Sequence, residues 1–97
     1  MPPSNLAAMV SQQITIINKL GLHARAASKL VNQANQFKCD LYIIRNNNRV
    51  NAKNIMGVMM LAAGKDTTVT LEAEGIDEMD CLNAVITLIN NQFDETE

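Results

Sequence analysis

Residues 13–35 are QITIINKLGLHARAASKLVNQAN, and the spacing of their apolar side chains changes once along this stretch. Up to Ile17 the apolar residues are β-branched and follow a period of two, which is typical of a strand. From Ala24 they recur at spacings of three and four, between charged and amide side chains, which is typical of an amphipathic helix. The stretch therefore predicts a strand, a loop at Gly21 and a helix of about three turns.

The chain continues with a second alternation over residues 39–45, followed by three asparagines. Asparagine tolerates left-handed backbone geometry, so the triplet predicts a hairpin turn into a short strand around Val50. Beyond that strand, Asn54 stands where an N-cap belongs and Gly64 where the helix should close. We therefore expect a short apolar helix between them.

A fourth strand and a last helix complete the pattern. Residues 67–73 alternate again, and Asp77 is expected to cap the helix that follows. The apolar stripe of that helix consists of Leu82, Val85, Ile86, Ile89 and Phe93. Split β-α-β units in this order form an antiparallel sheet with its helices on one face. We predict an α+β fold of order βαββαβα, an open-faced β-sandwich with a four-stranded antiparallel sheet and three helices on one face.

The 97 residues suffice for one domain with one core, and 47% hydrophobic against 19% charged residues exclude a wholly disordered chain. The predicted division is a disordered leader at residues 1–11, one domain at residues 12–93 and an acidic tail at residues 94–97. No apolar run is long enough to span a bilayer, and the start of the chain lacks the parts of a secretory signal. We expect a cytoplasmic protein without membrane insertion.

Side chains that bind structural zinc are too few in this chain. Cys39 and Cys81 are the only cysteines, 42 positions apart, and there is one histidine. We expect the two thiols to be buried and reduced. Neither a metal nor another cofactor is predicted.

The net charge of −2 conceals a polarised chain. Residues 1–53 carry seven basic side chains and one acidic one, a net of +6, whereas residues 54–97 carry one basic and nine acidic ones, a net of −8. A basic half indicates an anionic ligand or a charged partner. The acidic half, which includes the tail, is interpreted as a solvated surface.

His23, the only histidine, lies where the first loop turns into the first predicted helix. The unpaired N–H groups of a helix start bind anions, and Arg25 stands in the first turn, with Lys19 and Lys29 on either side. A neutral imidazole is also a nucleophile toward phosphorus. The pattern predicts a histidine that accepts a phosphoryl group. The plainer alternative is a polar cap without chemistry.

The chain contains two motifs, GLHARAA at residues 21–27 and NAKNIMGV at residues 51–58. Together they resemble the HPr family, the histidine phosphocarriers of the bacterial phosphotransferase system, and the resemblance extends over residues 13–93. It implies the same open-faced fold. It also implies that His23 accepts a phosphoryl group on Nδ1 from enzyme I and passes it to an EIIA domain for sugar uptake, while Arg25 contacts that group. Such a protein is a carrier, modified in each cycle, and not an enzyme.

The chain departs from the family pattern at two positions. Ala26 stands where the family commonly has proline, and the helix should persist because alanine is the best helix former. Asn54 stands where many members carry a regulatory serine. An amide still caps a helix but cannot accept a phosphoryl group, so we expect no regulation by serine phosphorylation at this position.

The short helix after Asn54 has no polar face. Flexible methionines suit a surface that meets several partners in turn, and the family uses this helix, with the start of the first helix, to bind enzyme I and EIIA. Next to Arg25, the expected partner-binding residues are Ala24, Ser28, Ile55, Met56 and Met59. In the alternative, the whole apolar run fills the core. We expect a monomer that forms transient complexes.

Two other functions stay open. A regulatory paralogue from the nitrogen-related phosphotransferase branch shares the same motifs, and the absence of a serine at Asn54 favours it.

An RNA-binding module shares the order of elements and a basic half. However, only Phe37, Tyr42 and Phe93 are aromatic, and they are not placed for base stacking. No nucleic-acid partner is therefore expected.

Overall fold

The computed structural model describes residues 9–95, and its four strands form one sheet. The strands are β2 (Met9–Thr15), β3 (Asp40–Arg45), β4 (Asn48–Asn51) and β5 (Thr68–Glu74). Their spatial order is β2-β5-β3-β4, and every neighbouring pair is antiparallel. The last strand in the sequence therefore lies inside the sheet, between the first strand and the β3–β4 hairpin.

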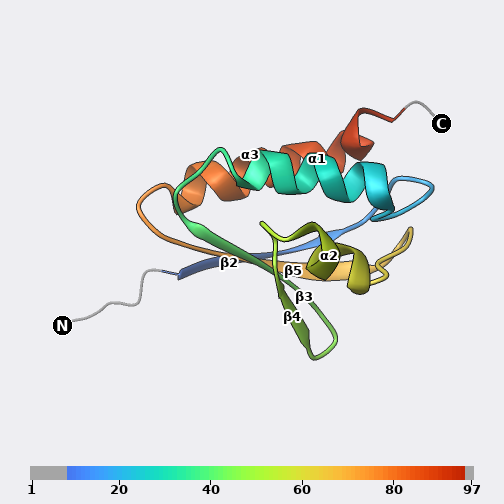
Figure 1. Ribbon diagram of the computed structural model, residues 1–97, viewed down its shortest axis with the longest axis horizontal. Coiled ribbons are helices and arrows are strands. Elements are labelled where there is room, and N and C mark those ends of the chain that lie inside the picture. The colour runs from blue at the N-terminus through green and yellow to red at the C-terminus, as the bar shows by residue number, and fades with distance from the viewer. Residues whose placement is uncertain (1–8, 96–97) are drawn as a thin grey trace.

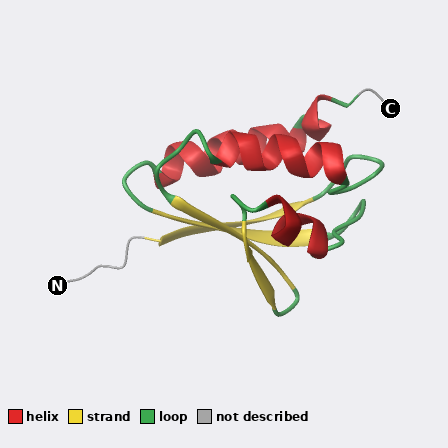
Figure 2. Cartoon of the chain, in the orientation of Figure 1, coloured by secondary structure: helices red, strands yellow, loops and turns green. Residues whose placement is uncertain are grey.

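The helices cover one face of this sheet (Figure 1, Figure 2). They are α1 (Ala24–Ala34), α2 (Ile55–Met60) and α3 (Glu78–Asn90), followed by the short 3-10 helix η1 (Gln92–Asp94). α1 packs against α3, and both α2 and η1 contact α1. The predicted α+β open-faced sandwich of order βαββαβα is confirmed. Within residues 9–95 no helix is long and apolar enough to cross a bilayer.

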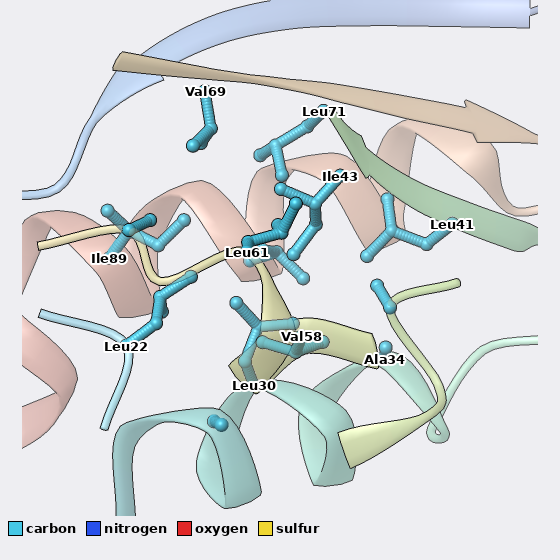
Figure 3. Packing of buried hydrophobic residues seen from close by; sticks show 14 of the residues in the cluster. Leu22, Leu30, Ala34, Leu41, Ile43, Val58, Leu61, Val69, Leu71 and Ile89 are labelled. Carbon is cyan, nitrogen blue, oxygen red and sulfur yellow. The ribbon is translucent and has the colours of Figure 1, made fainter. Parts of the chain in front are cut away.

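The core lies between the sheet and the helices (Figure 3). Every second side chain of β3 and β5 points to the covered face, as the alternation predicts, and packs with the apolar stripes of α1 and α3. The fully buried side chains include Leu30, Leu41, Ile43, Leu71, Val85 and Ile89. Burial of one such side chain contributes about 1.5–3 kcal/mol, and these side chains lie on strands and helices that the two periods of the sequence predict.

β2 begins at Met9, inside the predicted disordered leader of residues 1–11. Met9 pairs with Glu74, because β5 is long enough to offer it a partner. Residues 11–13 are all polar, so this part of the strand lacks the alternation of apolar and polar side chains that predicts a strand. The predicted leader is therefore wrong for the first residues of β2. The rest of it, residues 1–8, lies outside the described residues.

α2 ends at Met60, and the prediction that Gly64 closes it is wrong. The left-handed residue after the helix is Ala62, with a φ of 52°, whereas Gly64 does not have a positive φ. The Arg45 guanidinium donates to the carbonyl oxygens of Leu61 (2.8 Å) and Ala62 (3.2 Å). A charged side chain from the sheet thus satisfies carbonyl groups at the helix end, where local rules favour a glycine.

Asp77 occupies the N-cap position of α3, but its side chain does not cap the helix as predicted. The carboxylate instead accepts the backbone N–H groups of Lys38 and Cys39, each at 2.8 Å. The bond from Lys38, followed by the bond from Cys39, lowers the pKa of Asp77, because both favour the charged carboxylate. Asp77 therefore ties the start of α3 to the segment before β3.

α3 ends at Asn90, so Phe93 does not belong to its apolar stripe as predicted. Phe93 is nevertheless fully buried. It lies in η1 with a left-handed backbone, at a φ of 54°. The buried ring anchors the end of the chain, and the left-handed turn sets the direction of the residues that follow.

Cys39 and Cys81 are buried free thiols, as predicted. Burial raises the pKa of Cys81 to about 12, and the neighbouring Cys39 thiol adds to this effect. A protonated thiol in the core behaves as a small apolar side chain, so both cysteines contribute packing.

Candidate functional site

His23 is the N-cap residue of α1. Its backbone is extended (φ −72°, ψ 177°), and its carbonyl accepts the Ala27 N–H at 2.8 Å, which starts the helix. The imidazole does not hydrogen-bond to the helix. The first-turn N–H groups, which have no acceptor within a helix, therefore stay available to an anion beside the ring.

The loop that carries His23 is held against the segment after α2. Gly21 has a φ of 65°, and a Cβ there would lie 2.5 Å from the Ala63 carbonyl oxygen. The next residue, Leu22, donates its N–H to that same oxygen at 2.9 Å. The glycine of the GLH motif is thus required both by the left-handed backbone and by the close approach of another segment.

Glu95 reaches the imidazole from the other end of the chain. Its Oε2 lies 2.5 Å from His23 Nε2, and the two residues are 72 positions apart. The Glu95 side chain is only 7% exposed, against 27% for His23. The interpretation of residues 94–97 as a solvated tail outside the domain is therefore wrong for Glu95. Residues 96–97 lie outside the described part of the chain.

Asn18 supports both partners of this pair. It is fully buried, and its Nδ2 donates to the Gly21 carbonyl at 2.8 Å and to Glu95 Oε1 at 3.0 Å. Asn18 was not predicted as a site residue, because an amide side chain that follows a predicted strand is typical of an ordinary loop. A polar side chain directly after a run of isoleucines was the only available signal.

The segment before Glu95 has an unusual backbone. Gln92, Phe93 and Asp94 have φ angles of 57°, 54° and 61°, and each left-handed residue costs about 1–2 kcal/mol. Complete burial of the Phe93 ring offsets part of this cost. In addition, Lys29 Nζ donates to the Phe93 carbonyl at 2.6 Å. Lys29, predicted as a charge flanking the site, thus holds the tail segment in place.

A cavity of about 590 Å³ opens beside His23. Its lining is completed by Leu20, Ala24, Arg25, Lys29, Asp94 and Glu95. Arg25 is exposed, and its guanidinium makes no hydrogen bond or ion pair with the residues that the structure describes. The predicted Arg25 and Lys29 therefore lie at the cavity, whereas Lys19 does not line it. Among residues 9–95 no group of three side chains suited to bind a metal occurs.

The predicted partner face is largely exposed. Met56 is 64% exposed, and Ile55 and Met59 are 37% and 39% exposed, while only Val58 of α2 is buried. The alternative in which the whole apolar run fills the core is therefore wrong. Ala24 is exposed and Ser28 half-buried on α1, which contacts α2. Leu20 and Met60, which are 64% and 79% exposed, also add apolar surface that was not predicted.

Asn54 caps α2 as predicted. Its Oδ1 accepts the N–H groups of Met56 (3.0 Å) and Gly57 (3.3 Å).

Lys53, the residue before the cap, donates its Nζ to the Phe37 carbonyl at 2.8 Å. This lysine joins α2 to the end of α1, and the start of α1, α2 and η1 all lie at one end of the molecule (Figure 1).

The chain is similar to known proteins in sequence and in structure. A family model described as the PTS HPr component phosphorylation site matches residues 10–91. The phosphocarrier protein HPr of Neisseria meningitidis serogroup B is 52% identical over 89 residues, which cover 92% of this chain and 100% of that protein. The phosphocarrier protein HPr of Pseudomonas aeruginosa is 54% identical over 90 residues, with the same coverage. The crystal structure of HPr-C-His from Thermoanaerobacter tengcongensis is similar with a TM-score of 0.88 and 40% identity, covering 91% of this chain and 99% of that one.

One further relative has a different name. The phosphocarrier protein NPr of Shewanella violacea is 40% identical over 86 residues, which cover 89% of this chain and 94% of that protein. The chain is thus similar to phosphocarriers of both names.

Proposed function

This chain belongs to the HPr family of phosphocarrier proteins, and on that premise we propose that His23 accepts a phosphoryl group on Nδ1 from enzyme I and passes it to an EIIA domain in sugar uptake. The observation that carries the proposal is the position of His23 at the start of α1, beside a cavity that Arg25 and Lys29 also line. The relatives are named phosphocarriers, so the protein is a carrier modified in each cycle rather than an enzyme.

The transfer step uses the lone pair of Nδ1. This lone pair attacks the phosphorus of the phosphohistidine on enzyme I, and a new N–P bond forms while the N–P bond of the donor breaks. The electron pair of that broken bond returns to the imidazole of the donor. Nδ1 is bonded to Cγ and so lies closer to the backbone than Nε2. A phosphoryl group on Nδ1 is therefore nearer to the first-turn N–H groups of α1.

Arg25 provides the positive charge for the phosphoryl group. Its guanidinium is exposed and stands two residues beyond His23, at the mouth of the cavity. A hydrogen bond between a guanidinium and a phosphoryl oxygen contributes about 1.5–3 kcal/mol. We propose that Arg25 makes this contact during transfer.

The partner face comprises Ile55, Met56 and Met59 of α2 and the exposed Ala24 and half-buried Ser28 of α1. α2 contacts α1, and His23 stands at the start of α1, so we expect a protein that docks on these side chains to lie close to the imidazole. Methionines adapt to different contours, which suits docking of enzyme I and EIIA in turn. We propose a monomer in the cytoplasm that forms both complexes transiently.

A second candidate function is the regulatory role of a nitrogen-related carrier. Two observations favour it: the similarity to a protein named NPr, and the asparagine that fills the N-cap of α2 in place of a hydroxyl group. Rates of transfer from the phosphorylated protein to a sugar-branch EIIA and to a nitrogen-branch EIIA distinguish the two. A higher rate to the sugar-branch acceptor supports sugar uptake, and a higher rate to the other supports regulation.

The test of the carrier function is incubation with enzyme I and phosphoenolpyruvate. Intact-protein mass spectrometry should show one added phosphoryl group that is lost in acid, and the His23→Ala variant should show none. The amide NMR spectrum of His23→Ala serves as the control for an intact fold. Labelling that survives the substitution, or that resists acid, contradicts the proposal.

A further inference from the structure

The structure assigns a role to Glu95 that deepens the proposed function and rests on it. We propose that Glu95 is a positioning residue: its carboxylate holds the His23 imidazole in the tautomer that carries the proton on Nε2 and leaves the lone pair on Nδ1. Glu95 lies beyond residues 10–91, the segment that the family match covers.

The geometry of the pair dictates the tautomer. A neutral imidazole has one N–H donor and one nitrogen acceptor, whereas an ionised carboxylate only accepts. With Glu95 Oε2 at 2.5 Å from Nε2, the bond forms only when Nε2 bears the hydrogen. Nδ1 then keeps its lone pair, which is the group that attacks phosphorus.

The side chain of Glu95 is held in the site by burial and by a hydrogen bond. Its side chain is 7% exposed, and Asn18, itself fully buried, donates to the carboxylate oxygen that His23 does not use. Asn18 also donates to Gly21 in the loop that carries His23. One buried amide thus sets the carboxylate and the histidine loop relative to each other. Both contacts come from the amide hydrogens of Asn18, and its Oδ1 has no hydrogen-bond partner among the described residues.

The same pair serves the transfer step itself. When Nδ1 bonds to phosphorus and the N–P bond of the donor breaks, Nε2 retains its proton and the ring of His23 becomes positively charged. The Glu95 carboxylate faces that charge at Nε2. A buried carboxylate acts on a histidine in this way in the serine-protease triad, where it holds the tautomer and stabilises the imidazolium. Glu95 is therefore expected to accelerate phosphorylation despite its negative charge.

The decisive variant is Glu95→Gln. The single oxygen of the glutamine amide is expected to accept the Asn18 hydrogen bond, which turns the NH₂ group toward His23 Nε2. An amide donor at Nε2 favours the opposite tautomer, with the proton on Nδ1. The matched control is Asp94→Asn, which removes the same charge from the neighbouring residue at the same cavity, where no contact with His23 Nε2 exists in the described chain.

Long-range ¹H–¹⁵N NMR spectra of the imidazole, recorded above pH 8 on the full chain, measure the tautomer without any transfer reaction. We expect Nε2–H in the unaltered protein and in Asp94→Asn, and a shift toward Nδ1–H in Glu95→Gln, whose amide spectrum reports the fold. An Nδ1–H tautomer in the unaltered protein, or an unchanged tautomer in Glu95→Gln, overturns the proposal.

Phosphorylation by enzyme I provides the second readout. We expect the rate to fall at least about tenfold in Glu95→Gln and less in Asp94→Asn, because only the former changes the nitrogen that holds the lone pair. Glu95→Ala, which permits either tautomer, should lie between the unaltered protein and Glu95→Gln. Equal acceleration in Glu95→Gln and Asp94→Asn overturns the proposal, since the carboxylates then act only by repulsion. If enzyme I does not label even the unaltered protein, the proposed function fails, while the NMR result still decides the role of Glu95.

Discussion

The first and second helices of this chain begin in different ways. At the start of α2, Asn54 caps the helix with its own side chain and accepts two first-turn N–H groups. At the start of α1, His23 has the same extended backbone of an N-cap, but its side chain turns away to Glu95. One helix start is therefore closed, and the other is open to an anion. The side chain of Asn54 thus stabilises the start of α2, whereas the start of α1 keeps first-turn N–H groups that an anion can bind.

The largest effect on the open helix start is expected from Arg25→Ala. Loss of one charge-assisted hydrogen bond to the phosphoryl group should slow transfer roughly 10- to 150-fold, while the unfolding free energy changes little because the guanidinium is exposed. Stopped-flow or quench-flow transfer from enzyme I measures the rate. The control is Lys38→Ala, which removes an equal charge from an exposed side chain beyond the other end of α1. Equal slowing in both variants would show that Arg25 acts only through net charge.

The closed helix start is tested by Asn54→Ala. Loss of both cap hydrogen bonds should lower the unfolding free energy by about 1 kcal/mol, measured by chemical denaturation. Asn54→Ser should restore most of this stability, because serine is an equally good cap. It should also become a substrate of HPr kinase with ATP, whereas the unaltered chain stays unlabelled. A stable Asn54→Ala variant, or labelling of the unaltered chain by that kinase, contradicts the assignment of Asn54 as a purely structural cap.

The smallest effect is expected at the start of α3, where Asp77 contributes to stability. The pKa of Asp77 is lowered by its backbone hydrogen bonds, so its contribution to stability is present above its ordinary value of 3.8 and is lost as the pH falls through the lower pKa of the folded state. In Asp77→Asn the unfolding free energy should therefore fall less steeply as the pH is lowered. Thermal unfolding between pH 2 and 5 measures this difference. Asp80→Asn, which removes an equal charge from the first turn of the same helix, is the control for the loss of charge alone.

Features that depend on neighbours in the chain were predictable from the sequence. The switch from a period of two to spacings of three and four located α1, and the asparagine before an apolar run located the cap of α2. The position of His23 and Arg25 at a helix start followed from the same local pattern. The end of α2 was not predictable, because Arg45 of the sheet satisfies the carbonyls of the two residues that follow the helix. Likewise, the carboxylate of Asp77 serves a segment 39 positions away.

The amino-acid sequence by itself determined the order of elements and the identity of the candidate nucleophile, since periodicity and caps act within a few residues. Only the tertiary structure decided the environment of that nucleophile. Glu95 reaches His23 across 72 positions because Phe93 is buried in the core and three left-handed residues redirect the chain after it. No local pattern encodes such a contact, because it exists only after the packing of η1 against α1 has brought the acidic end of the chain to its basic half.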